Sequence, residues 1–273
     1  MVTELTSVRT PRVKAVVRLT KRAFREREGR FLAEGPQACR EAAAVSGALL
    51  ELYVTADAAT RHRDVIDAAA ASGAEIVRAS GEVVAALSGT VTPQGMVGVC
   101  VLPRTTYPEV LSGSPRLIAV LAQVRDPGNA GTVIRTADAA GADAVVITEA
   151  SVDVYNPKTV RATAGSLWHL PVATGAEITA LANALHDNGF RVLAADGVGE
   201  RDLDALIDDG SLIAPTAWVF GNEAWGLPTT ITALADEVVR VPIHGHAESL
   251  NLATAAAVCL YASARAQRRP AST

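Results

Sequence analysis

The chain has 273 residues, 49% of them hydrophobic and 20% charged, with a formal net charge of −4. This length allows two domains with separate cores. The net negative charge does not by itself indicate a nucleic-acid-binding protein. No apolar run is long enough to cross a bilayer, and the first residues lack the apolar core of a signal peptide. Together with three cysteines that match no zinc or redox spacing, these features predict a cytoplasmic protein with no membrane partner.

The most basic stretch of the chain is residues 9–30, which hold nine Arg or Lys and two Glu. Apolar residues recur there at roughly helical spacing, which predicts one amphipathic basic helix. A solvated helix face is the commoner role of such a run. Here nearly all the charges have one sign in an acidic protein, which favours contact with nucleic-acid phosphates. The candidate phosphate-binding residues are Arg9, Arg12, Arg18, Lys21, Arg22 and Arg25.

The rest of the first half alternates short apolar runs with segments of helical composition, which is typical of a small α/β domain. The expected strands are 31–35, 49–54, 75–77 and 97–102, and the expected helices are 36–47, 61–72 and 82–87. Residues 103–115 are rich in Pro, Ser and Thr and mark a domain boundary. We therefore expect one domain over 1–106, a linker over 107–115 and a second domain over 116–273.

The second half repeats the alternation with more apolar strands, as expected for a doubly wound α/β domain with a buried parallel sheet. The expected strands are 117–124, 144–148, 191–195, 218–220 and 238–241, with a short candidate at 170–173. The expected helices are 132–140, a segment from 156 toward 165, 178–188 and 250–264.

Three polar, glycine-bearing blocks follow strands of the second half: DPGNAGTVIRTADAAGA from Asp126, FGNEAWGL from Phe220 and VPIHGHAESLNLATAAAV from Val241. In open α/β sheets, ligands bind at the carboxyl ends of parallel strands, so we expect a site there. In the first block, Asn129 is a candidate helix cap. An arginine in the first turn, Arg135, would oppose the positive end of the helix dipole and should face an anion or a partner chain.

Several familiar sites are not indicated by these blocks. The G-x-G-x-x-G spacing is absent around Gly221, which disfavours a dinucleotide-dependent oxidoreductase. Ser249 is not in a G-x-S-x-G hydrolase elbow. His244 and His246 lack an obvious third ligand, so we expect no metal.

Taken in order, the three blocks resemble the three motifs of the SpoU family of SPOUT-class RNA methyltransferases. The likeness extends to FLAEGP from Phe31, TPQG from Thr92 and NPK from Asn156, and thus covers nearly the whole chain. It implies a C-terminal SPOUT domain with a parallel sheet and a deep trefoil knot, a rare exception among folds. It also implies a small ribosomal-protein-like α/β domain that presents RNA. The chain departs from the family pattern at Val241 and in the second block, at Trp225.

The resemblance implies transfer of a methyl group from S-adenosylmethionine to a ribose 2′-hydroxyl of RNA, most simply 23S ribosomal RNA, as in the thiostrepton-resistance group. Arg135 would act on that hydroxyl or position the neighbouring phosphate, and Asn129 would orient Arg135. Glu223 would anchor the second loop. The substrate side would be shaped by Ser249 and Asn251. Residues expected to line the cofactor pocket are Thr148, Gly221, Asn222, Val241, Ile243 and Leu250.

The family also implies a homodimer packed through the small-residue helix at 250–264, with Arg135 reaching the cofactor of the other protomer. Two alternatives share the fold: a tRNA ribose methyltransferase, and a catalytically inert RNA-binding ribosome factor. The presence of Asn129, Arg135, Glu223 and Asn251 argues against the inert factor.

Overall fold

The computed structural model describes residues 4–222 and 225–268, which fold into two compact units. The first unit runs up to Pro103 and also contains Asp153–Trp168, and the second contains Arg104–Val152 and the chain from His169 onward. The segment 153–168 falls inside the expected C-terminal domain, yet Tyr155 and Trp168 pack their rings against Phe31 of the first unit. The domain limits drawn from the sequence stay a prediction.

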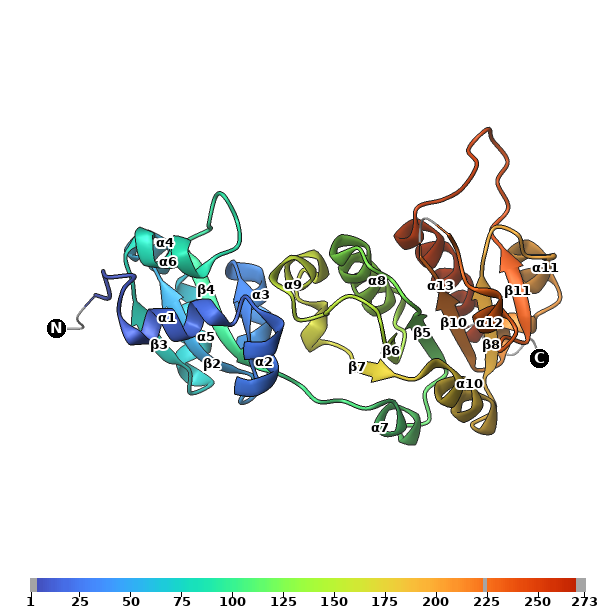
Figure 1. The fold of residues 1–273 in the computed structure, drawn as a ribbon, viewed down its shortest axis with the longest axis horizontal. Coiled ribbons are helices and arrows are strands. Elements are labelled where there is room, and N and C mark those ends of the chain that lie inside the picture. The colour runs from blue at the N-terminus through green and yellow to red at the C-terminus, as the bar shows by residue number, and fades with distance from the viewer. Residues whose placement is uncertain (1–3, 223–224, 269–273) are drawn as a thin grey trace. The chain divides into compact units, whose positions relative to one another are not determined.

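The first unit is a four-stranded sheet in the order β1-β4-β2-β3, with helices on both faces (Figure 1). Strand β4 is antiparallel to both of its neighbours, and β2 and β3 are parallel. Its strands are β1 (Arg30–Glu34), β2 (Leu49–Val54), β3 (Glu75–Arg78) and β4 (Met96–Val101). Its helices are α1 (Pro11–Arg18), α2 (Arg22–Glu28), α3 (Pro36–Ala44), α4 (Ala56–Arg61), α5 (Arg63–Ala71), α6 (Gly81–Leu87) and α9 (Pro157–Thr163).

Both faces of this sheet are buried because its strands carry apolar residues at successive positions. Leu32 and Tyr53 contribute to a core shared with α1 and α6. On the α3 side, a Cβ at Gly98 would lie 3.4 Å from the Cys39 sulfur and 2.8 Å from a Leu49 methyl carbon. Gly98 therefore allows α3 to approach the sheet closely.

The basic segment forms two helices, so the prediction of a single helix is wrong. The break has a tertiary cause at Leu19, whose side chain is buried in the core. Its carbonyl oxygen accepts a hydrogen bond from the Arg25 guanidinium at 2.7 Å rather than continuing a helical ladder. Lys21 is then extended before α2 begins.

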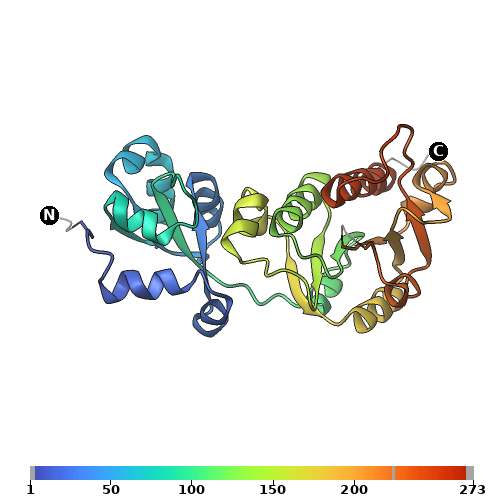
Figure 2. The same ribbon diagram turned by 45° about the horizontal axis from the view of Figure 1, so that its top comes forward.

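The second unit is a seven-stranded parallel sheet in the order β7-β6-β5-β10-β8-β11-β9, which confirms the predicted parallel α/β fold (Figure 2). The strands are β5 (Leu117–Leu121), β6 (Ala144–Thr148), β7 (Val172–Ala176), β8 (Arg191–Ala195), β9 (Arg201–Asp202), β10 (Thr216–Phe220) and β11 (Glu237–Arg240). The helices are α7 (Tyr107–Ser112), α8 (Pro127–Ala140), α10 (Ile178–Asp187), α11 (Leu203–Asp208), α12 (Thr229–Thr232) and α13 (Leu252–Arg268).

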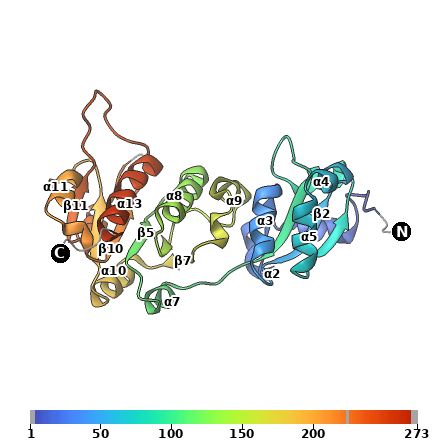
Figure 3. The same cartoon turned by 180° about the vertical axis from the view of Figure 1, so that it is seen from behind.

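Helices cover both faces of this sheet (Figure 3). Helices α7, α10 and α12 bury one face through residues such as Leu111, Leu181 and Ile231. Helices α8 and α13 pack against each other and cover the other face. There the fully buried Trp218 of β10 donates its indole N–H to the Ser263 hydroxyl of α13 at 2.8 Å. The hydrogen bond removes the cost of burying an unpaired polar group.

Two helices begin where the sequence did not indicate. Helix α7 lies within the expected linker, because a capping box joins Thr106 to Glu109 and Val110 turns into the core. Helix α8 begins at Pro127, since the Asp126 carboxylate accepts the Asn129 backbone N–H at 2.8 Å. Asp126 is thus the N-cap, and the expectation that Asn129 caps this helix is wrong.

Candidate active site

A cavity of the second unit lies where β8, β10 and β11 end, at the carboxyl edge predicted from the sequence. It encloses about 560 Å³, within the usual range for a small-molecule pocket. Three loops surround it: the turn after β8, the second block after β10 and the third block after β11. Predicted cofactor residues that line it are Gly221, Asn222, Val241, Ile243 and Leu250.

Backbone hydrogen bonds join two residues of the second block to each other. The backbones of Asn222 and Gly226 exchange hydrogen bonds of 3.2 and 2.9 Å, and Gly226 has a left-handed φ of 65°. A Cβ on Gly221 would lie 2.7 Å from Leu227 Cγ and 2.8 Å from the Gly226 carbonyl oxygen. Glycine is required at 221 by this close approach and at 226 by the backbone conformation.

Asp196 joins two of the pocket's loops. One carboxylate oxygen accepts the Val198 N–H at 3.2 Å, within its own turn, and the other accepts the Leu227 N–H at 3.0 Å, across to the second block. Hydrogen bonds to a charged acceptor are stronger than neutral ones, so this single side chain fixes the spacing of both loops. The Asp-Gly step after β8 indicated only that the strand ends there.

Arg240 and Asp202 form the outer wall of the pocket. The Arg240 guanidinium donates to the carbonyl oxygens of Gly199 at 2.7 Å and Glu200 at 3.1 Å, and pairs with the Asp202 carboxylate at 2.6 Å. These contacts tie β11 to the turn after β8. Sequence reasoning missed both residues, because neither belongs to a motif and they are 38 positions apart.

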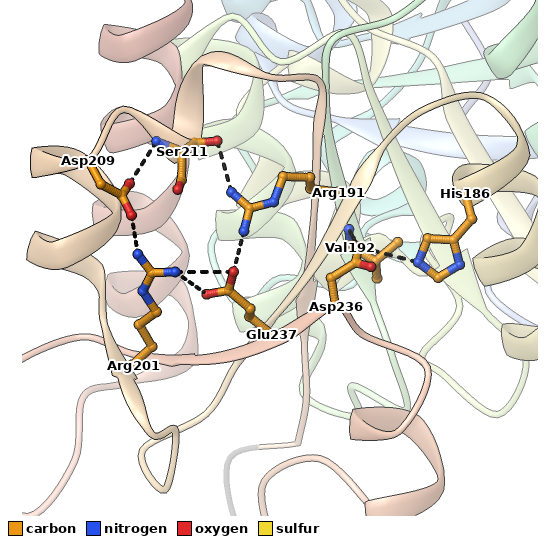
Figure 4. Close-up of polar contacts among 8 residues, drawn as sticks. All are labelled: His186, Arg191, Val192, Arg201, Asp209, Ser211, Asp236 and Glu237. Atoms are coloured by element: carbon orange, nitrogen blue, oxygen red, sulfur yellow. Dashed lines mark hydrogen bonds and ion pairs between the residues drawn. The ribbon is translucent and has the colours of Figure 1, made fainter.

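The sheet edge beneath this wall carries a larger polar network (Figure 4). Glu237 pairs with Arg191 and Arg201, and Arg201 also pairs with Asp209. Because Arg191, Arg201 and Glu237 lie on β8, β9 and β11, the network links three neighbouring strands. Glu237 is the first residue of β11 and Arg191 the first of β8, so the network holds the amino-terminal ends of these two strands, opposite the end from which the third block departs.

The first and third blocks meet through two asparagines. Asn251 donates its side-chain amide to the Asn129 side-chain oxygen at 3.1 Å. The Asn251 oxygen in turn accepts the Ala253 N–H at 2.9 Å, which caps the start of α13. Ser249 and Glu248, just before it, line the pocket. The structure therefore brings Asn129 to Asn251, which lies in the chain between the pocket-lining residues Leu250 and Leu252.

Arg135 lies farther along α8 than expected. It is the ninth residue of a helix that begins at Pro127, so it is more than two turns from the positive end and the dipole argument fails. Six residues separate it from Asn129, a rise of about 9 Å with a turn to a different face. Asn129 therefore does not orient Arg135 within one chain. The Arg135 side chain is exposed and makes no hydrogen bond or ion pair with a residue that the structure describes.

Two further site predictions have different outcomes. Thr148 is buried outside the pocket, where its hydroxyl accepts the Gln123 N–H at 3.4 Å and donates to the Leu121 carbonyl oxygen at 3.3 Å. Thr148 is not among the residues that line this cavity. It instead supports the turn after β5, where Gln123 has a left-handed φ of 57°. Glu223 lies outside the described residues.

Three of the predicted phosphate-binding residues already form ion pairs in the structure. Arg25 is only 2% exposed and is paired with Asp153, so its guanidinium cannot reach an RNA phosphate. Arg12 is held by Glu51 and Glu75, with N–O distances of 2.7 and 2.6 Å. These carboxylates neutralise Arg12. Arg22 pairs with Glu26 at 2.6 Å, but its side chain is 66% exposed. Arg9, Arg18 and Lys21 are exposed as well.

Within residues 4–222 and 225–268, no group of three His, Cys, Asp or Glu side chains could hold a metal ion. No helix in those ranges is both long and apolar enough to span a membrane. The three cysteines are free and buried, and burial raises the pKa of the Cys39 and Cys259 thiols to about 12.

Comparison with known proteins gives a consistent result for both units. Residues 116–261 match the SpoU rRNA Methylase family, and residues 10–98 match the MRM3-like substrate binding domain. The 23S rRNA (guanosine(2553)-2′-O)-methyltransferase RlmP of Bacillus subtilis is 31% identical, over 94% of this chain and 98% of that protein.

Two solved structures with bound AdoMet are also similar. An AdoMet-bound rRNA methyltransferase from Sinorhizobium meliloti has a TM-score of 0.82 at 29% identity, over 96% of this chain and 97% of that one. The SpoU methyltransferase AviRb from Streptomyces viridochromogenes, in complex with AdoMet, has a TM-score of 0.81 at 27% identity, over 94% and 98%.

Proposed function

The chain belongs to the SpoU rRNA methylase family, and on this premise we propose that it methylates a ribose 2′-hydroxyl of 23S ribosomal RNA with S-adenosylmethionine as methyl donor. The observation that carries the proposal is the pocket at the ends of β8, β10 and β11, built from the second and third family blocks. It occurs in a fold shared with two AdoMet-bound methyltransferases.

The residues present fit this cofactor. Val241, Ile243 and Leu250 offer an apolar surface for an adenine ring, and Gly221 leaves the backbone accessible. Glu248 supplies a carboxylate suited to an ammonium group or to ribose hydroxyls. When bound, S-adenosylmethionine supplies a methyl carbon on a positively charged sulfur, which is an electrophile for the ribose oxygen.

In the proposed reaction, the hydroxyl oxygen forms a bond to the methyl carbon while the carbon–sulfur bond breaks and its electron pair stays on sulfur. The hydroxyl proton must leave, and the oxygen must be held in line. A guanidinium stays protonated in proteins, so Arg135 acts as a donor that positions the phosphate beside the target ribose. Asn129 and Asn251 hold the first and third blocks together on the substrate side.

We also propose that the active protein is a homodimer in which Arg135 serves the partner's pocket. Two features support this arrangement: Arg135 is exposed, and α13 carries the exposed side chains of Val258 and Tyr261, at 40% and 52%. Because α13 packs beside α8, a partner docked on α13 would lie next to the helix that bears Arg135.

Arg135→Ala should keep cofactor binding and dimer mass but lower methyl transfer by about a hundredfold or more, the usual scale for a positioned catalytic group. Mixing this variant with Gly221→Trp, which blocks the cofactor pocket, should restore part of the activity in heterodimers. An active monomer in sedimentation and single-turnover assays would rule out the shared site.

The first unit would contact RNA phosphates through its exposed cations, which are Arg9, Arg18, Lys21 and Arg22. The trefoil knot expected of the family is part of this proposal. The sheet order is compatible with it, since β8 lies between β10 and β11. We place the reaction in the cytoplasm, because three free cysteines suit a reducing compartment.

The decisive experiment is a map of ribose methylation in RNA from a strain that lacks the protein and from the same strain complemented with it. We expect one 23S position to lose methylation in the first and regain it in the second. An unchanged 23S map with a change in tRNA would overturn the proposed substrate. An unchanged map of all RNA, with a folded protein that does not bind S-adenosylmethionine, would favour the inert factor.

A further inference from the structure

Trp225 is a large aromatic side chain exposed beside the pocket. It is 57% exposed, whereas Trp218, on the strand that leads into the same loop, is completely buried. Gly226, the residue after Trp225, exchanges backbone hydrogen bonds with Asn222.

Residues on both sides of Trp225 are anchored by hydrogen bonds to other loops. The Asn222 side-chain amide donates to the Gln123 carbonyl oxygen at 3.4 Å, and the Leu227 N–H donates to Asp196 at 3.0 Å. Asn222 and Gly226 both line the pocket, and Trp225 directly precedes Gly226 in the chain.

A cation lies over the indole ring. The guanidinium carbon of Arg125 is 5.3 Å from the ring centroid, which is within cation–π range. Arg125 is exposed, makes no ion pair with any residue in the described ranges and directly precedes Asp126, the cap of α8. The pair thus joins the first block to the second, with a charged group and a flat apolar ring side by side.

Single exposed aromatic residues are common and often mean nothing. Two features set this pair apart: Trp225 directly precedes Gly226, which lines the proposed methyl-donor pocket, and a cation lies over the ring.

From these contacts we infer that Trp225 and Arg125 form a stacking platform for one unpaired base of the RNA, next to the ribose that is methylated. This inference rests on the proposed function. Proteins that recognise RNA by sequence bind mostly unpaired nucleotides, whose bases have lost the stacking energy of the helix. An aromatic face returns part of that energy to any base, and a guanidinium plane can stack or contact the adjoining phosphate. The platform therefore selects an unpaired nucleotide and tolerates different bases.

The test uses the tryptophan emission of the full chain, titrated with a single-stranded RNA 12-mer and with an abasic 12-mer that has the same phosphates. We expect the base-bearing strand to quench the exposed tryptophan and protect it from iodide, and the abasic strand to do neither. Trp225→Phe should remove the quenching but keep binding, and Trp225→Ala should weaken binding of the base-bearing strand about fivefold to a hundredfold. Ile207→Ala, an exposed apolar residue on α11, is the matched control and should change nothing.

Calorimetry with S-adenosylmethionine shows whether each variant keeps a folded pocket, and Trp225→Phe provides a second variant should Trp225→Ala fail to fold. Equal quenching by both strands would mean that only phosphates are contacted, and this result would overturn the platform. If Trp225 of an RNA-free dimer is already protected from iodide, the residue belongs to the subunit interface, and this result would also overturn the stacking platform. Failure of the proposed function is distinct, because the unaltered protein would then neither bind S-adenosylmethionine nor methylate RNA.

Discussion

Replacing Gly221 by alanine tests the pocket with a single methyl group. The new Cβ would lie 2.7 and 2.8 Å from two side-chain carbons of Leu227 and 2.8 Å from the Gly226 carbonyl oxygen. Contacts under 3.0 Å cannot persist, and here one neighbour is backbone, so the loop must shift. Overpacking of this kind costs about 1–3 kcal/mol. The shift would loosen both the Asn222–Gly226 closure and the bond from Leu227 to Asp196.

Because this closure shapes the pocket, we expect most of the cost to appear in cofactor binding. At 1.4 kcal/mol per decade, the Kd for S-adenosylmethionine should rise by about fivefold to 150-fold. The assay is calorimetry on the full chain, with the melting temperature measured alongside. Gly245→Ala is the control, since it lies in the third block and a Cβ there meets no atom within 4 Å. If Gly221→Ala binds S-adenosylmethionine within twofold of the unaltered protein, the closed loop does not shape the pocket.

Three further outcomes follow from other parts of the chain. Ser263→Ala leaves the buried Trp218 indole N–H without its acceptor, so denaturant unfolding of the second unit should show a loss of about 1–3 kcal/mol, and an unchanged midpoint would contradict this. Replacing exposed cations of the first unit by Gln should lower the salt dependence of RNA binding by a log–log slope of up to about 0.9 per phosphate contact on duplex-like RNA, and leave cofactor binding intact. The residues to replace together are Arg18, Lys21 and Arg22. Burial raises the pKa of the Cys39 and Cys259 thiols to about 12. Their contribution to stability is therefore complete below the ordinary thiol pKa of about 8.5 and is lost as the pH rises from there toward 12. Iodoacetamide at pH 8 should label these two thiols only after the protein unfolds.

Strands were the most predictable part of the fold. The sequence runs at 49–54, 144–148 and 191–195 coincide with β2, β6 and β8, because residues buried on both faces read as continuous apolar segments. The prediction of a single helix in the basic segment was wrong because the break between its two helices depends on a long-range contact. This break depends on Arg25 reaching Leu19 and Asp153, and Asp153 is 128 positions away. Local spacing contains no signal for such a contact.

The candidate site shows the same contrast between local patterns, which are predictable, and long-range contacts, which are not. The three loops were predictable from their motifs, since glycine and polar residues after apolar strands mark the carboxyl edge of a parallel sheet. What joins the loops was not, because Asp196, Asp202 and Arg240 act through backbone groups and partners that only the strand order β10-β8-β11 brings together. A carboxylate that accepts two backbone N–H groups from different loops can stand at any position whose Cα lies near both. Its sequence neighbourhood is therefore free to vary, and the geometry of the pocket is the feature that such residues preserve.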